Sequence, residues 1–255
     1  MQELNIGYTI KGSKGKGISG AEVFEAETED GKQIAVRTTK DSLATYRQGN
    51  EFLFVDSLSD AGLAEAYTSH LLLPMGYAVH EKGSEAEHLD IIYPLMQSDM
   101  YAYVLDSPEG DQLSEHSYIG RGDFINFVSD MAQAVDFMHA AGFVHRDLDK
   151  IRNYLTDGQS FFLADMHLVT RINKPDDILK DHSGYIIMLE GLMMQKLRME
   201  LMIKKPVLKV LESSNQEFAA TFGQPMDDLF RKFETDPAIS FVSFTGQILN
   251  LLQDN

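Results

Sequence analysis

Short stretches in which apolar and polar residues alternate dominate the first third of the chain, and turn-forming residues separate them. Such alternation is typical of β-strands that bury one face. The Asp30-Gly31 pair favours a tight hairpin turn between two of these stretches. We expect a glycine-rich loop at Tyr8–Gly20 and four extended segments after it: Ala21–Glu29, Gln33–Thr39, Leu71–His80 and His88–Met96.

Two segments carry apolar residues at the spacing of a helix with one buried face. The first is Leu43–Leu58, in which we expect Leu53, Phe54 and Leu58 to face the core. The second is Phe124–Ala141, which has the more regular pattern. Both segments are long enough to be helices of ordinary length.

The chain changes character after the second of these helices. Gly142 provides a stop signal for the helix. Two short extended pieces are then predicted at Tyr154–Thr156 and Phe161–Ala164, and from Ser183 onward the pattern is mostly helical. Strands first and helices later indicate an α+β chain with two segregated parts.

Composition narrows the classes of function. The chain has 255 residues and a net charge of −17, so its overall field does not favour nucleic acid or anionic membranes as partners. It has no cysteine, which excludes disulfides and Cys-ligated zinc. No apolar run is long enough to span a bilayer, and the first ten residues lack the pattern of a secretory signal. We therefore expect a cytoplasmic protein.

The strongest chemical signal is a pair of charged strings that follow the Phe124–Ala141 helix. The first, His145–Asn153, offers Asp and Asn side chains on a loop, and the second, Phe161–His167, offers Asp165 at the end of a strand. Phosphoryl transfer needs a carboxylate that orients the attacking hydroxyl and oxygen ligands for Mg²⁺. The two strings supply both.

The strings FVHRDLDKIRNYL and FFLADMH resemble the catalytic loop and the metal-binding motif of protein kinases. By position, the resemblance implies that Asp147 is the catalytic base and that Lys150 contacts the γ-phosphate. It also implies that Asn153 and Asp165 are the Mg²⁺ ligands.

The earlier part of the chain is similar to the nucleotide-binding lobe of the same family, in the same order. The glycines resemble the phosphate-covering loop, Ile34–Arg37 resembles the third-strand motif with its phosphate-binding cation, and Ile91–Met96 resembles the fifth strand and hinge. The resemblance implies that the following residues bind ATP: Gly15, Gly17, Gly20, Val23, Ala35, Arg37, Glu51, Tyr93 as the gatekeeper, Pro94, Leu95 and Met96.

The match departs from the family pattern at several points. Arg37 stands where the family has Lys, and the catalytic loop has one extra residue, which we place at Asp149. Met166-His167 replaces Phe-Gly. The glycine loop is one residue longer than in the family pattern, so that Val23 takes the place of the usual valine. Few residues separate Asp165 from Asp181, so phosphorylation-driven ordering of an activation segment is not expected.

The resemblance implies an α+β, protein kinase-like bilobal fold with a short activation segment. Residues 1–96 would form a small β-rich N-lobe and residues 97–255 a larger, mainly helical C-lobe, with an ATP·Mg²⁺ cleft between them. Asp181–Gly184 would open a helix that supports the catalytic loop. In size and layout the chain resembles secreted bacterial effector kinases, which would place it in the host cytosol.

The leading functional hypothesis is ATP·Mg²⁺-dependent phosphoryl transfer to protein Ser/Thr, with ATP and a protein as partners. Three alternatives stay open: a pseudokinase that serves as a binding or scaffold module, a kinase-fold adenylyltransferase, and a small-molecule kinase of the aminoglycoside type. The choice between an enzyme and a scaffold depends on Arg37. We predict an ion pair between Arg37 and Glu51, with the guanidinium also reaching the phosphates. The alternative is an outward Arg37 with Lys40 as the functional cation.

Overall fold

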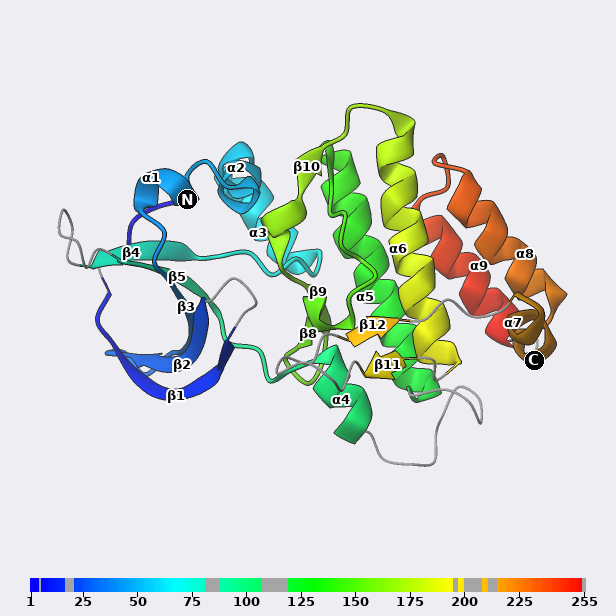
Figure 1. Ribbon diagram of the computed structural model, residues 1–255, viewed down its shortest axis with the longest axis horizontal. Coiled ribbons are helices and arrows are strands. Elements are labelled where there is room, and N and C mark those ends of the chain that lie inside the picture. The colour runs from blue at the N-terminus through cyan, green and yellow to red at the C-terminus, as the bar shows by residue number, and fades with distance from the viewer. Residues whose placement is uncertain are drawn as a thin grey trace. The chain divides into compact units, whose positions relative to one another are not determined.

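The computed structural model describes residues 1–4, 6–16, 21–80, 88–106, 119–194, 197–199, 208–210 and 215–253. The chain divides into two compact units. Unit 1 contains Met1–Thr68 and Leu72–Gln97, and unit 2 contains Ser69–Leu71 and Ser98–Asn255. Each unit is built around its own elements (Figure 1).

Unit 1 is built on an antiparallel sheet in the order β1-β2-β3-β5-β4, and the sheet is strongly curved (Figure 1). Its strands are β1 (Tyr8–Lys16), β2 (Glu22–Thr28), β3 (Gln33–Thr39), β4 (Gly76–His80) and β5 (His88–Pro94). Gly31 closes the β2–β3 turn with a φ of 83°, a conformation that glycine adopts without steric cost. The expected hairpin at Asp30-Gly31 is therefore confirmed.

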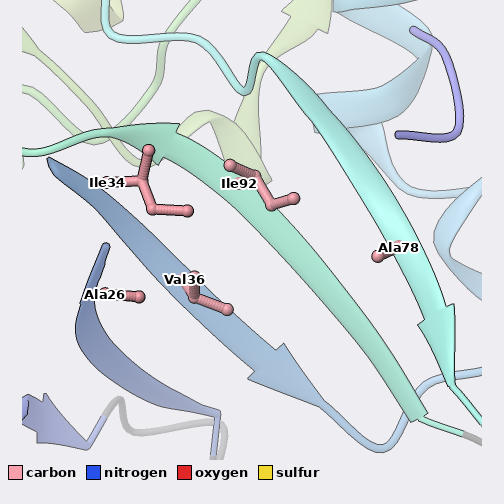
Figure 2. Close-up of a cluster of buried hydrophobic side chains, with 5 residues drawn as sticks. All are labelled: Ala26, Ile34, Val36, Ala78 and Ile92. Carbon is pink, nitrogen blue, oxygen red and sulfur yellow. The ribbon is translucent and has the colours of Figure 1, made fainter. Parts of the chain in front are cut away.

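The period-two pattern of the strands gives the sheet two different faces. One face buries a cluster of apolar side chains from β2, β3, β4 and β5 (Figure 2): Ala26, Ile34, Val36, Ala78 and Ile92. The other face buries a second cluster, to which the helical segment after β3 contributes: Tyr46, Phe52, Tyr77, Leu89 and Ile91. Residues of odd number in β3, including Ala35 and Arg37, lie on this second face.

The prediction of a single helix over Leu43–Leu58 is wrong. The structure has two short helices there, α1 (Leu43–Tyr46) and α2 (Asn50–Ser57), and Gly49 lies at the N-cap of the second. The break changes the buried face, so that Leu53 is 52% exposed while Phe54 is fully buried. A further helix, α3 (Asp60–Thr68), follows directly.

The segments expected at Leu71–His80 and His88–Met96 form shorter strands. Of Leu71–His80 only the last five residues form β4, and the fifth strand ends at Pro94 rather than Met96. The buried backbone of Leu71 instead bridges to Leu163 within unit 2. The segment expected to be a glycine loop is a strand over most of its length, because β1 includes Gly15, whereas Gly17 and Gly20 lie outside the described residues.

Unit 2 is mainly helical. Its helices are α4 (Met100–Asp106), α5 (Arg121–Ala140), α6 (Pro175–Met193), α7 (Asn215–Phe222), α8 (Gln224–Thr235) and α9 (Phe241–Gln253), with the 3₁₀ turns η1 (Ile151–Asn153) and η2 (Met166–Leu168). Its strands are β6 (Ser98–Asp99), β7 (Phe143–Val144), β8 (Tyr154–Thr156), β9 (Phe161–Leu163), β10 (Thr170–Arg171), β11 (Leu197–Met199) and β12 (Leu208–Val210).

The core of unit 2 is organised around α5. The helix packs against α9 and β9, and α8 packs against α6 and α9. The side chains that α5 buries recur at helical spacing: Phe124, Phe127, Val128, Met131, Ala132, Ala134, Val135 and Met138. The predicted helix over Phe124–Ala141 is thus confirmed, with its first turn extended to Arg121. No helix in the described ranges combines the length and apolarity that a membrane crossing requires.

One expectation for this part is wrong. The helix expected to open at Asp181–Gly184 already begins at Pro175, because Asp177 caps it by accepting hydrogen bonds from the backbone of Asn173 and Lys174. The described part of the chain after Ser183 is mostly helical, as expected, and β11 and β12 add a short antiparallel hairpin.

Gly142 provides a test of the backbone argument at the end of α5. Gly142→Ala is expected to lower the free energy of unfolding by about 1 kcal/mol, because Gly142 has a φ of 83° and an L-residue is strained there. Gly122→Ala in the first turn of α5 is the matched control. Neither position has an atom within 4 Å of the added Cβ, so only the backbone differs. Gly122→Ala is expected to stabilise by about 0.5 kcal/mol. Urea unfolding measures both, and equal effects would contradict the argument.

Candidate active site

The end of the β8–β9 hairpin brings together two of the residues expected to bind metal. Tyr154 of β8 pairs with Leu163 of β9, so Asn153 and Asp165 lie at the same end of the hairpin. The backbone N–H of Ala164 donates to the carbonyl of Asn153 at 2.8 Å, which ties the two segments together. Asp165 adopts a left-handed conformation with φ 63° and ψ 61°, which turns the chain sharply after β9.

Asp147 is buried at the centre of the loop and is held by two side chains. Lys150 donates to its Oδ1, and the amide nitrogen of Asn153 donates to its Oδ2 at 2.9 Å. The same nitrogen donates to the backbone carbonyl of Asp147 at 2.8 Å. Because its nitrogen is turned toward Asp147, Asn153 directs its amide oxygen away from that residue. The loop thus fixes the carboxylate of Asp147 and leaves the amide oxygen of Asn153 as a candidate metal ligand.

The backbone of the loop is supported from α6. The fully buried carboxylate of Asp181 accepts the backbone N–H of His145 at 2.8 Å and that of Arg146 at 2.6 Å. His139 of α5 contacts the same carboxylate at 2.9 Å. Although Asp181 does not begin the helix, the expectation that this region supports the catalytic loop agrees with these contacts.

His145 is part of the core. Burial lowers its pKa, and its Nε2 donates to the carbonyl of Ala164 at 2.9 Å. A neutral ring that holds the residue before Asp165 connects the loop to the end of β9. His145 therefore has a structural role.

Unit 1 places the residues expected around the nucleotide on one face of its sheet. Val23 pairs with Arg37 and Ala35 pairs with Tyr93, and the side chains of paired residues project from the same face of the sheet. Gly15 of β1 pairs with Val23 in turn. Glu22 pairs with Thr38 on the opposite face, which is consistent with Val23, not Glu22, taking the valine position.

Glu51 of α2 is the centre of a buried polar cluster on that face. Its Oε2 accepts from Arg37 and from the hydroxyl of Tyr46 at 3.1 Å, and its Oε1 accepts from the hydroxyl of Tyr93 at 2.7 Å. The predicted ion pair between Arg37 and Glu51 is confirmed. Lys40, the alternative cation, lies exposed just beyond β3.

The environment of this cluster maintains the charge of Arg37. Burial alone would lower the pKa of the guanidinium, but the fields of Tyr93 and Glu51 outweigh it and the pKa is raised. Burial, with the charge of Glu51, raises the pKa of the Tyr93 hydroxyl well above its usual value. The guanidinium carbon lies 5.4 Å from the ring centroid of Tyr93, within cation–π range. Tyr93 thus holds the pair through both its ring and its hydroxyl.

The segment expected to form the hinge follows without a helix or a strand of its own. Pro94 ends β5, Leu95 is partly exposed and Met96 is buried. The sequence expectations for these three residues, and for Gly15, concern backbone contacts to a nucleotide, and they stay predictions.

Two contributors to the site are not evident from the sequence. Tyr46 reaches Glu51 only because the chain breaks between α1 and α2. His167, which replaces the family's glycine, has Nδ1 2.6 Å from Oδ1 of Asp165, and this hydrogen bond raises its pKa. In the sequence alone, a tyrosine five residues before Glu51 and a histidine two residues after Asp165 are only weak signals of a role in the site.

A family model described as protein tyrosine and serine/threonine kinase matches residues 10–189. The chain belongs to this protein kinase family. The match covers every candidate residue from Gly15 to Asp165. It confirms the expected α+β, protein kinase-like fold, with a small sheet-rich unit and a larger, mainly helical one.

Membership in the kinase family also establishes the general class of activity. The chain is a phosphotransferase by family, and the family generally uses ATP and Mg²⁺ and acts on protein substrates. An open pocket beside the catalytic loop of this kinase is lined by Leu148, Lys180, Ser183 and Gly184, among others. It lies wholly within unit 2.

Proposed function

We propose that the chain is an ATP·Mg²⁺-dependent protein kinase that phosphorylates Ser or Thr side chains. The observation that supports this most is the arrangement of Asp147, Lys150 and Asn153 in one loop, with Asp165 at the adjoining strand end. We keep the assignment of residues 1–96 to a nucleotide-binding lobe and of 97–255 to a catalytic lobe as part of this proposal.

Asp147 is suited to the role of catalytic base. Its carboxylate is fixed by Lys150 and Asn153, so it can accept the proton of an acceptor hydroxyl without first reorganising. The neighbouring cation Lys150 is 42% exposed, which leaves its ammonium able to contact phosphate oxygens as well. The open pocket beside the loop offers space for the acceptor peptide.

The oxygens at the end of the β8–β9 hairpin suit Mg²⁺. This hard cation prefers carboxylate and amide oxygens, which Asp165 and Asn153 supply from segments joined by a backbone hydrogen bond. Bound there, Mg²⁺ would neutralise charge on the phosphate groups of ATP. The protein's own contribution is to hold the two ligands at one hairpin end.

In unit 1 we assign the adenine and phosphate contacts to one sheet face. Ala35 and Val23 present small or apolar groups there, and Arg37 presents a cation. We propose that the hinge residues Leu95 and Met96 bind the base through their backbone.

We also propose an effector-like kinase that needs no activation-segment phosphorylation. Between η2 and Pro175 there is only β10 with its flanking residues, and β10 already pairs with β7. The N–H of Ile172 further bonds to the carbonyl of Gly142 at 2.8 Å. Because this segment is short and held by backbone hydrogen bonds, phosphorylation would have little scope to change its conformation.

Asp165→Ala is expected to remove most of the stabilisation that ATP·Mg²⁺ gives the chain. Ligand at a hundred times its Kd stabilises the parent by about 2.7 kcal/mol, because it binds only the folded state. Thermal unfolding with and without ATP·Mg²⁺ measures the shift. Asp228→Ala, which removes an exposed carboxylate on α8, is the control and should keep the full shift. An unchanged shift in Asp165→Ala would show that Asp165 does not hold the metal.

The reaction itself is tested by supplying γ-labelled or α-labelled ATP with Mg²⁺ and a cell lysate. Transfer of γ label to protein, with the label found on phosphoserine or phosphothreonine, is the expected result. Label on phosphotyrosine would correct the acceptor, and transfer of α label would indicate an adenylyltransferase. No transfer to protein from either nucleotide would overturn the proposal in favour of a pseudokinase or a small-molecule kinase.

A further inference from the structure

Two histidines and a carboxylate meet on one face of the unit 1 sheet. His80 of β4 and His88 of β5 are cross-strand partners, and their rings stack with centroids 4.7 Å apart and an interplanar angle of 10°. Asp90 lies two residues beyond His88, on the same face. Its Oδ2 is 3.0 Å from Nε2 of His80. One ligand atom from each of the three side chains lies within 4.8 Å of the other two.

This cluster lies on the sheet face opposite to that of Arg37. Asp90 pairs with Thr38, the residue after Arg37 in β3, and adjacent residues of a strand point to opposite faces. The same face carries the buried cluster of Val36, Ala78 and Ile92 (Figure 2). The three side chains are therefore separate from the polar cluster around Glu51.

We propose that His80, His88 and Asp90 form a binding site for a divalent transition metal of the zinc class. Two imidazole nitrogens and one carboxylate oxygen make a ligand set that suits Zn²⁺ and related ions better than Mg²⁺. Ligands about 2.1 Å from a tetrahedral ion lie about 3.4 Å from each other, close to the observed separation of His80 and Asp90. The three protein ligands would leave a fourth position for water.

Two further side chains orient the carboxylate in the way that outer partners of metal ligands do. The hydroxyl of Thr38 donates to Oδ1 of Asp90 at 2.5 Å, which directs Oδ2 toward His80. The hydroxyl of Tyr8, from β1, donates to Oδ2 and lies 3.2 Å from Nε2 of His80. Four of the five strands thus contribute to the site or to its support.

Burial gives a reason for a cation at this position. Asp90 is only 5% exposed, and a buried carboxylate is costly unless charge and hydrogen bonds compensate it. A simple ion pair with His80 would use one imidazole, whereas a metal would use both stacked rings. A bound ion would join β4 to β5, and Thr38 would extend the link to β3. The proposal does not depend on phosphotransferase activity.

The test uses the full chain, treated with EDTA, dialysed and titrated with Zn²⁺ without nucleotide. We expect one ion per chain by calorimetry. At a hundred times the Kd the melting temperature should rise by about 5–10 °C, because the ion binds only the folded state. Mg²⁺ at the same concentration should not reproduce the shift. Co²⁺ bound in place of Zn²⁺ should give visible absorption bands of a four-coordinate ion.

Variants decide whether these residues hold the ion. His80→Gln and His88→Gln should each weaken Zn²⁺ binding by about 100-fold or more, and Tyr8→Phe by about 10- to 100-fold. His167→Gln is the matched control, since His167 also pairs with a carboxylate, Asp165, but in unit 2. It should keep the parental affinity. Melting in EDTA shows which variants fold, and His80→Gln, at a 40% exposed side chain, carries the test if His88→Gln does not fold.

Three results would overturn the proposal. They are no Zn²⁺ binding by the parent chain, parental affinity in a folded His80→Gln, and loss of binding in His167→Gln with retention in the cluster variants. The last of these would move the zinc to the Asp165 end of the β8–β9 hairpin.

Discussion

Asp147→Asn is expected to lower the turnover of phosphoryl transfer by about 10³-fold while leaving ATP affinity within a factor of about two. General base catalysis contributes 10²- to 10⁴-fold, and it acts in the transition state, so ground-state binding of the nucleotide changes little. The variant should fold normally. Its side-chain carbonyl can still accept the hydrogen bond that Asn153 gives to Oδ2, and the contact that is lost, from Lys150 to Oδ1, belongs to a partly exposed side chain. Steady-state kinetics and a separate measurement of ATP binding give the two quantities.

The matched control for Asp147→Asn is Asp157→Asn. Asp157 lies at the β8–β9 turn, where its Oδ1 accepts the backbone N–H groups of Gln159 and Ser160, and an asparagine can do the same. This variant should keep parental turnover. If Asp147→Asn also keeps it, Asp147 has no part in the chemistry and the proposed mechanism fails.

Much of the small sheet could be predicted because its signals are local. Asp30-Gly31 set the hairpin, and the strand expected at Gln33–Thr39 has those bounds in the structure. The number of helices in the segment after β3 could not be predicted equally well. Gly49 lies where the helix breaks, and a single glycine within an apolar pattern does not say whether the chain bends or continues. The consequence was the wrong orientation of Leu53.

The site shows the same division between local and distant information. Asp147, Lys150 and Asn153 could be found together because a loop of seven residues contains all three. The sequence predicted a supporting helix at Asp181–Gly184, but the hydrogen bond from the backbone N–H of His145 to the Asp181 carboxylate could not be predicted, since it joins residues more than thirty positions apart. The role of Tyr46 likewise depends on how the separate helices α1 and α2 place its hydroxyl against Glu51.

Arg37 is the residue on which the choice between an enzyme and a scaffold depends. Its pairing with Glu51 fixes the guanidinium on the face that also carries Val23 and Ala35. Only a quarter of the side chain is exposed, so the cation is held by the fold rather than by solvent. Arg and Lys differ at such a position, because the planar guanidinium can contact a carboxylate and phosphate oxygens at once, whereas an ammonium is a compact charge.

Arg37→Ala is therefore expected to have two effects. It should lower the free energy of unfolding by roughly 3 kcal/mol, the low end for breaking a buried ion pair, because Glu51 would keep only the hydroxyls of Tyr46 and Tyr93. It should also reduce kcat/KM for ATP by about 10- to 100-fold, the loss expected for a charge-assisted hydrogen bond to phosphate. Urea unfolding and kinetics at varied ATP measure these changes.

Two further substitutions separate the phosphate contact from the ion pair. Arg37→Lys keeps the charge beside Glu51 and should retain ATP binding within about tenfold, although the shorter, point-like cation changes how the phosphates are held. Lys40→Ala removes an exposed cation beyond the end of β3 and should leave binding and transfer unchanged. The opposite pattern, in which Arg37→Ala is silent and Lys40→Ala abolishes ATP binding and transfer, would mean that Lys40 is the functional cation. Arg37 would then be a structural partner of Glu51 alone, and the assignment of the β3 face to the nucleotide would be wrong.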